Sequence, residues 1–287
     1  MRLIVGIVVL FACVMGGYVA EGGNIVVLMQ PFEALIILGA AMGAFVIGNT
    51  GPVLKQATKV FGTLMRGPRY NKAAHIELLG VQFSIFKLVQ SRGILALEPH
   101  IEDPENSSIF QNFPTFAKNH HAVEFMCDYL RMVTLGTRNQ HEIEALIDEE
   151  LETHHQEQER LVSAIQALAD GTPALGIVAA VLGVIHTMGA INQPPAVLGE
   201  MIGGALVGTF LGVFCSYGFF GPMAQSLHNI YEAEGKYWLS MKAGLLAHVS
   251  GYPPAIAIEF ARKALMSEVR PTFIEVEEAT AGLPALT

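Results

Sequence analysis

The sequence predicts an all-α polytopic membrane protein with four transmembrane helices, a helical cytoplasmic domain between spans two and three, and a helical cytoplasmic tail. Two observations support this fold class. The chain contains four long stretches without Asp, Glu, Lys or Arg, and all 17 Lys and Arg residues lie outside them. Roughly 20 helical residues, each rising about 1.5 Å, cross a hydrocarbon core of about 30 Å. The four stretches approach or exceed that length, and they are Leu3–Ala20, Ala34–Leu54, Gly171–Gly199 and Met201–Tyr231.

The basic residues predict how these spans are oriented. If the chain crosses the membrane at each stretch in turn, the connections Glu21–Glu33 and Ile191–Glu200 share one side, and neither contains Lys or Arg. The other side receives Arg2, the segment Lys55–Arg160 and the tail Lys236–Arg270. Because basic loops stay on the cytoplasmic side of a membrane, both termini and the large middle segment are expected in the cytoplasm.

This threading predicts four parts of the chain. They are a transmembrane hairpin over residues 1–54, a cytoplasmic helical domain over 55–169, a second transmembrane hairpin over 170–231 and a cytoplasmic tail over 232–287. A secretory signal peptide is the alternative for the first span, because Met1-Arg2 precedes an apolar run. Its cleavage would leave three spans and place the basic middle segment outside, so a retained span is favoured.

Composition and short motifs argue against several functional classes. Apolar residues make up 52% of the chain and charged residues 15%, a balance that soluble domains rarely show. The net charge is −9, and acidic residues gather between Glu142 and Glu159, which argues against a nucleic-acid surface. His141-Glu142 has no second histidine at metalloprotease spacing, and the three cysteines lie far apart. We therefore expect no enzyme activity, no metal site and no cofactor.

Glycine and proline predict several helix ends. Gly51-Pro52 should end the second span near the inner surface, because proline supplies no amide hydrogen and disfavours helix in the preceding residue. The apolar tail segment Ala243–Ile258 contains Gly251 and Pro253-Pro254, so it should not form a fifth span. In the middle segment we expect a loop at Glu98–Pro114 and helices at Tyr70–Ser91, Phe116–Leu135 and Glu142–Ala169, the last continuous with span three.

The third and fourth spans are expected to pack closely against each other. Lipid gives apolar helices no hydrophobic reason to associate, so close approach through small residues stabilises such pairs. Small residues recur on both spans at helical spacing, as Gly204, Gly208 and Gly212 on span four and Gly176, Ala180 and Gly183 on span three.

The absence of Asp, Glu, Lys and Arg inside the spans bears on ion transport. Ion pathways usually need an ionisable group at membrane depth. His186 lies near the outer end of span three, where a structural or interfacial role is favoured over a proton relay. An ion-binding carboxylate would therefore have to come from a partner subunit. Thr209 could contribute a hydroxyl to that shared path, or could bond back to its own helix.

Two prolines lie near the cytoplasmic ends of these spans, Pro173 on span three and Pro222 on span four. Each could simply begin or end a helix. Alternatively, each could loosen the backbone where the span meets a cytoplasmic helix, and so form a hinge. The residue pattern leaves both interpretations open.

Several long motifs of the chain are specific enough to compare with a known family. They are Asp170–Val184 in the third span, Val207–Gly212 in the fourth, Glu144–Glu150 in the helix before span three, and Gly251–Lys263, Arg270-Pro271 and Phe273–Glu275 in the tail. These segments resemble the corresponding motifs of the MotA family, the stator subunits of the bacterial flagellar motor, and the similarity covers essentially the whole chain.

The resemblance implies an inner-membrane stator in which five copies of this chain surround two copies of MotB. The single span of MotB carries the ion-binding aspartate that this chain lacks. Ion passage would drive rotation of the ring and turn the rotor protein FliG through charged contacts. By the same resemblance, Pro173 and Pro222 couple ion flow to torque, and Ala180 lies on the ion path, to which Thr209 is the other candidate contributor.

The rotor-contact charges match the family less closely. The family pairs a basic residue with a glutamate eight positions later. Glu98 occupies the glutamate position, but Gln90 stands at the basic one. The resemblance therefore assigns rotor contact to Glu98 and Glu150, with Arg92 as the substitute cation and Lys87 as the next nearest.

The transported ion is expected to be a proton. Sodium-driven relatives place a threonine where this chain has Ala180, and a dehydrated sodium ion needs several oxygen ligands. Two alternatives remain for the protein as a whole. ExbB and TolQ proteins have related chemistry but three spans and an outside N-terminus. A structural membrane scaffold would explain the glycines but not the two prolines or the missing carboxylate.

Overall fold

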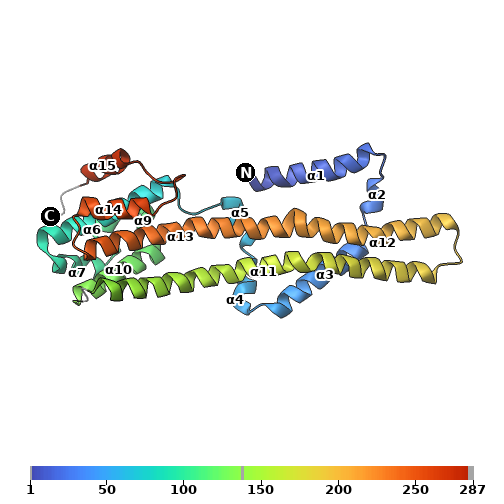
Figure 1. Cartoon of the computed structure of the whole chain (residues 1–287), viewed down its shortest axis with the longest axis horizontal. Helices are drawn as coiled ribbons and strands as arrows, with labels where there is room; N and C mark the ends of the chain where they lie inside the picture. The colour runs from blue at the N-terminus through green and yellow to red at the C-terminus, as the bar shows by residue number, and fades with distance from the viewer. Residues whose placement is uncertain (1, 137–138, 284–287) are drawn as a thin grey trace. The chain divides into compact units, whose positions relative to one another are not determined.

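The computed structural model describes residues 2–136 and 139–283, and within these ranges every regular element is a helix. The chain forms two compact units (Figure 1). Unit 1 comprises residues 1–67 and 157–230, and unit 2 comprises residues 68–156 and 231–287. The expected all-α class is confirmed.

Unit 1 contains the apolar helices. Four segments are long and apolar enough to cross a membrane, as expected. Helix α12 packs against α2 and α3, and α1 contacts the short π-helical segment η2, where the ring of Phe11 lies 5.6 Å from that of Phe219. The helices of this unit are α1 (Arg2–Ala20), α2 (Ile25–Leu28), α3 (Pro31–Gly48), α4 (Gly51–Ala57), α5 (Val60–Arg66), the later part of α11 (Gln140–Gly189), α12 (Pro195–Cys215), η2 (Ser216–Phe220) and the start of α13 (Gly221–Val249).

The second span ends earlier than predicted. Helix α3 stops at Gly48, and Asn49 and Thr50 are extended. Gly51-Pro52 then begins α4 instead of ending the span. The physical reason is that proline suits the first turn of a helix, where its missing amide hydrogen has no partner in any case.

Spans three and four are parts of very long helices. The predicted continuity of the acidic helix with span three is confirmed, because α11 runs unbroken from Gln140 to Gly189. The turn after it is shorter than the predicted Ile191–Glu200, since Pro195 already begins α12. Helix α12 continues through η2 into α13, so Pro173 and Pro222 both lie inside continuous helical structure. The interpretation of these prolines as helix starts or stops is wrong.

Unit 2 is built around α6 (Lys72–Arg92), which is buried on several sides. The ring of Tyr70 stacks on that of Tyr237 with centroids 3.8 Å apart, and Phe86 stacks on His248 at 4.3 Å. Gln82 donates a hydrogen bond to the Met241 carbonyl at 2.9 Å and joins α6 to α13. The other main helices of this unit are α10 (His120–Thr134), the first part of α11, the later part of α13, α14 (Pro254–Lys263) and α15 (Phe273–Ala281).

The predicted loop at Glu98–Pro114 is wrong in detail, because short helices occupy most of it. The next short helix begins at the last residue of the predicted loop, and Glu77 on α6 stabilises it by accepting hydrogen bonds from the Thr115 amide at 2.7 Å and the Phe116 amide at 3.1 Å. The local sequence does not predict this helix, because Glu77 lies 38 residues before Thr115. Within the predicted loop lie α7 (Glu98–Glu102) and α8 (Ser108–Gln111), while η1 (Ile94–Leu97) precedes it and α9 (Pro114–Ala117) follows from its last residue. The helix predicted at Phe116–Leu135 is therefore divided between α9 and α10.

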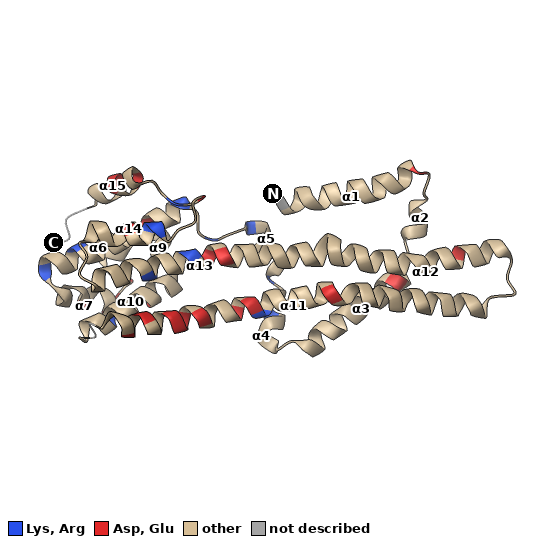
Figure 2. Ribbon diagram, in the orientation of Figure 1, with Lys and Arg blue, Asp and Glu red and all other residues tan. Residues whose placement is uncertain are grey.

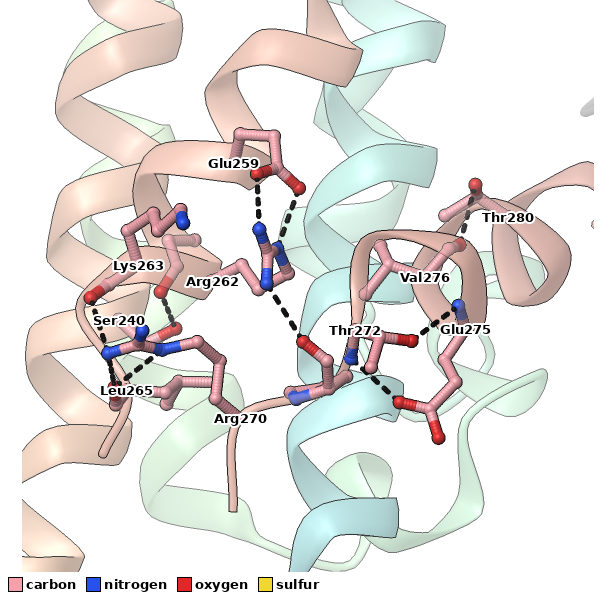
Figure 3. A network of polar contacts seen from close by, with 12 residues as sticks. Ser240, Glu259, Arg262, Lys263, Leu265, Arg270, Thr272, Glu275, Val276 and Thr280 are labelled. Carbon is pink, nitrogen blue, oxygen red and sulfur yellow. Dashed lines mark hydrogen bonds and ion pairs between the residues drawn. The ribbon is translucent and has the colours of Figure 1, made fainter. Parts of the chain in front are cut away.

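The tail is held in unit 2 by a polar network (Figure 3). Arg262 is 8% exposed and donates to both carboxylate oxygens of Glu259, at 2.7 and 2.8 Å, and to the Pro271 carbonyl at 2.9 Å. Thr272 and Glu275 form a capping box at the start of α15. Lys72 on α6 pairs with Glu275 at 2.7 Å, so the tail is bonded directly to the central helix of the unit.

Candidate functional site

Helices α11 and α12 run side by side in unit 1 with their backbones in contact (Figure 1). A Cβ atom added to Gly212 would lie 2.7 Å from the Cα of Gly176. One added to Gly208 would lie 3.1 Å from the Cβ of Ala179 and 3.2 Å from the amide nitrogen of Ala180, and one added to Gly183 would lie 2.6 Å from the Cβ of Ala205. The buried Ala179 side chain therefore takes the place predicted for Ala180 in this contact. Three successive levels of the pair therefore leave no room for a side chain.

Gly204 lies outside this contact. A Cβ added there would meet the side-chain amide of Gln30 at 3.1 Å, so Gly204 faces the segment before α3 and not span three. Ala205 takes the expected place of Gly204 against α11. The four-residue spacing identified the helix but did not resolve which of two neighbouring small residues faces the partner.

The hydroxyl groups of the pair differ in their hydrogen bonds. Thr172 donates to the Leu168 carbonyl at 2.6 Å, and Thr187 donates to the Gly183 carbonyl at 2.9 Å. The half-buried Thr209 hydroxyl makes no hydrogen bond to any residue in the described ranges, so it is not bonded back to its own helix. Thr209 follows Gly208, the residue that contacts Ala179 and Ala180, so Thr209 and Ala180 lie at the same level of the pair.

Ser216 is a polar contact that the sequence analysis missed. Its hydroxyl donates to the carbonyl of Ala169 on α11 at 2.6 Å, and the residue is 2% exposed. The available signal was its spacing, because Ser216 continues the four-residue series of Gly204, Gly208 and Gly212. A second polar contact joins α13 to α11 on the far side of the two prolines. His228 Nδ1 lies 2.8 Å from Glu159 Oε1.

Charge is sparse along the apolar helices and dense on the first part of α11 (Figure 2). Within α12 the only Asp, Glu, Lys or Arg is Glu200. His186 is exposed in the last turns of α11. In the part of the chain that the structure describes, no three His, Cys, Asp or Glu side chains are arranged to hold a metal ion.

Arg92 and Glu98 lie at one corner of unit 2. Arg92 ends α6, Gly93 follows with φ +82°, and Glu98 begins α7. Both charged side chains are exposed and form no ion pair with another described residue. Leu95 between them is 68% exposed. The connection from α6 to α7 therefore carries two exposed charges without ion-pair partners among the described residues, and an exposed apolar residue lies between them in the sequence.

Other charges of unit 2 are already engaged. The carboxylate of Glu150, expected at the rotor contact, accepts a hydrogen bond from the Tyr129 hydroxyl at 2.5 Å. Arg131 pairs with Glu102 at 3.0 Å and with Asp128 at 2.8 Å. The structure thus brings Arg92 and Glu98 to one corner and places Glu150 on a different element, α11, in an internal bond.

Two buried histidines in unit 2 are held neutral. Burial lowers the pKa of His75 and the pKa of His248 to about 4, because a charged imidazole would lose its hydration there. In contrast, the hydrogen bond from Lys72 lowers the pKa of Glu275 to about 2 and keeps that carboxylate charged.

Comparison with known sequences places the chain in a family. Residues 4–93 match the Motility protein A N-terminal family, and residues 117–239 match the MotA/TolQ/ExbB proton channel family. The chain is 41% identical over 278 residues to Motility protein A of Escherichia coli K12, covering 97% of this chain and 94% of that protein. It is 34% identical to the chemotaxis protein LafT of Vibrio parahaemolyticus, covering 97% and 98% of the two chains.

Comparison with solved structures agrees. A chain of the flagellar MotAB stator complex from Bacillus subtilis matches with a TM-score of 0.72 and 25% identity, covering 89% of this chain and 92% of that one. The sequence comparison and the structure comparison therefore identify the same family of proteins. The chain belongs to the Motility protein A family of the MotA/TolQ/ExbB proton channel proteins.

Proposed function

We propose that this chain is the stator subunit of a bacterial flagellar motor, which together with MotB converts proton flow across the inner membrane into torque on the rotor protein FliG. The observation that carries the proposal is the α11–α12 pair. Residues 171–199 and 201–215 of this pair contain no Asp, Glu, Lys or Arg, and the two helices are closely packed. A proline lies in each helical path, and each path continues without a break into a helix of unit 2.

The proton path is proposed to run along this pair with a carboxylate from the MotB span. The α11–α12 contact offers no Asp or Glu of its own between Asp170 and Glu200. The free hydroxyl of Thr209 is available to a water or to the partner's carboxylate. Ala180 at the same level supplies no side-chain oxygen, which favours a proton over a sodium ion.

Torque coupling is assigned to Pro173 and Pro222. Each removes one backbone hydrogen bond from a helix that otherwise runs on, so the helix is easier to bend there than elsewhere. The π-helical turn η2 directly precedes Pro222, and such turns mark irregular, often functional positions in helices. Movement at membrane depth would therefore reach unit 2 through α11 and α13.

The rotor contact is assigned to Arg92 and Glu98, with the exposed Leu95 between them in the sequence. Exposed charges without internal partners are free to pair with a protein surface of complementary charge. Glu150 remains part of the proposal by resemblance, although its bond to Tyr129 suits a supporting role. Gln90 contributes no charge here, and Arg92 stands in for the missing cation.

The assembly and orientation complete the proposal. Five copies of the chain would surround two copies of MotB, and both termini, residues 55–169 and residues 232–287 would lie in the cytoplasm, leaving 1–54 and 170–231 as the transmembrane hairpins. The support is the charge distribution, which leaves both predicted outer connections without Lys or Arg.

The test is co-expression with a MotB partner in a cell that lacks its own stator. Swimming should appear, should collapse with a protonophore and should persist without sodium. Glu98→Lys should reduce swimming, and a compensating charge reversal on FliG should restore it. Glu105→Lys, an exposed acidic residue elsewhere in unit 2, is the matched control and should swim normally. Sodium-dependent swimming, or equal effects of the two substitutions, would contradict the assignments.

A further inference from the structure

The Ala169 carbonyl has lost its usual helical donor. In an α-helix this carbonyl would accept the amide hydrogen of the residue four positions later, which is Pro173 and has none. A carbonyl left without a donor is costly where it is shielded from water, and Ala169 is only 2% exposed. The Ser216 hydroxyl fills the gap from the opposite helical path at 2.6 Å, although it lies 47 residues away in the sequence.

Ser216 also belongs to the irregular turn before the second proline. It is the first residue of η2, and its carbonyl accepts the amide hydrogen of Gly221, five residues later. Gly221, the donor of this π-type bond, directly precedes Pro222 in the sequence. One residue thus bonds through its side chain to the Pro173 turn and through its main chain to the turn that precedes Pro222.

The packing around this bond restricts other arrangements. One turn before Ser216, a Cβ added to Gly212 would lie 3.1 Å from the Thr172 carbonyl and 2.7 Å from the Cα of Gly176. The two helices are therefore in backbone contact beside the bond, and Ser216 itself is 2% exposed. A change in the geometry of either proline segment must stretch or break the hydroxyl bond.

We propose that Ser216 is a positioning residue for torque coupling, whose hydroxyl joins the Pro173 turn of α11 to the π turn before Pro222 so that the two proline segments move as one element. The inference rests on the proposed coupling role of these prolines. It adds a connection between them that neither proline supplies, since proline has no amide hydrogen to donate.

The bond itself is tested by a double-mutant cycle on the purified complex with MotB. S216A should lower the Tm by about 2–4 °C, as expected for one buried hydrogen bond. In the P173A background the restored amide hydrogen bonds to the Ala169 carbonyl, so S216A should then lower the Tm by less than about 1 °C. T187V removes a buried hydroxyl that bonds within its own helix, and it serves as the control. Equal losses in both backgrounds would overturn the assignment.

The coupling role is tested by measuring torque and proton influx separately. In tethered cells S216A should lower torque about twofold or more while proton influx stays unchanged, and S216T, where it keeps the native Tm, should restore torque. Unchanged torque, or parallel loss of torque and influx, would overturn the role. If the native chain itself fails to drive rotation, the proposed function fails instead, and the stability cycle still reports on the bond.

Discussion

Gly212→Ala adds one methyl group where α11 and α12 approach each other most closely, and its effect can be worked out from the structure. The new Cβ would lie 2.7 Å from the Cα of Gly176, 3.1 Å from its nitrogen and 3.1 Å from the Thr172 carbonyl oxygen. Carbon atoms in ordinary contact are about 3.5–4.0 Å apart, so the helices must separate by about 1 Å. All three neighbours are backbone atoms, and no side-chain rotation can relieve the clash.

That separation carries two penalties. Overpacking of this kind costs about 1–3 kcal/mol. The Ser216–Ala169 bond, one turn away, would lengthen from 2.6 Å to about 3.6 Å and be lost, which costs about 1 kcal/mol more. A total of about 2–4 kcal/mol should lower the Tm on the order of 5–10 °C.

The assay is thermal unfolding of the detergent-purified complex with MotB, followed by swimming of cells that carry the same variants. Gly203→Ala is the matched control on the same helix, because a Cβ there has no atom within 4 Å. It should leave the Tm unchanged or slightly raised, since alanine favours helix over glycine. Equal Tm values for the two variants would refute the reasoning that backbone contact holds this pair together.

Three further outcomes are expected. Thr209→Val should reduce proton influx about five- to tenfold by removing a hydroxyl from the path, whereas Thr187→Val, whose hydroxyl bonds within its own helix, should change it little. The native pKa of His75 is about 4, below the unfolded value of about 6.5, so the unfolded state binds more protons and stability falls with falling pH. The part due to His75 is about 2 kcal/mol between pH 8 and pH 5, and His75→Phe should remove it from a urea-unfolding profile, while an unchanged profile would contradict the assignment. Arg262→Lys should destabilise unit 2 by about 1–2 kcal/mol and speed proteolysis of the tail, because lysine cannot hold both oxygens of Glu259 and a carbonyl together; equal proteolysis rates would show that this network does not hold the tail.

Hydropathy, charge and small-residue spacing predicted the spans and the close approach of the last two, because lipid imposes these patterns over many residues. Finer features depended on tertiary partners. Helix α9, at the end of the predicted loop, forms where Glu77 accepts hydrogen bonds from the Thr115 and Phe116 amides. The choice between Gly204 and Ala205 at the α11 contact depends on Gln30, which no local pattern connects to α12. The hydrogen bond from Ser216 to Ala169 joins residues 47 positions apart. The only sign of it in the sequence was that Ser216 continues the four-residue spacing of the glycines on α12.

The bond between Lys72 and Glu275 joins residues 203 positions apart, and it has a consequence for biosynthesis. The ribosome completes α6 long before it makes α14 and α15, the tail helices that cover part of α6. During that interval the chain must insert α12 and its hairpin partner while α6 still exposes apolar surface. Unit 2 therefore finishes folding only after synthesis of the tail, so a chain truncated before α14 should depend on chaperones or be degraded even though all four spans have been made.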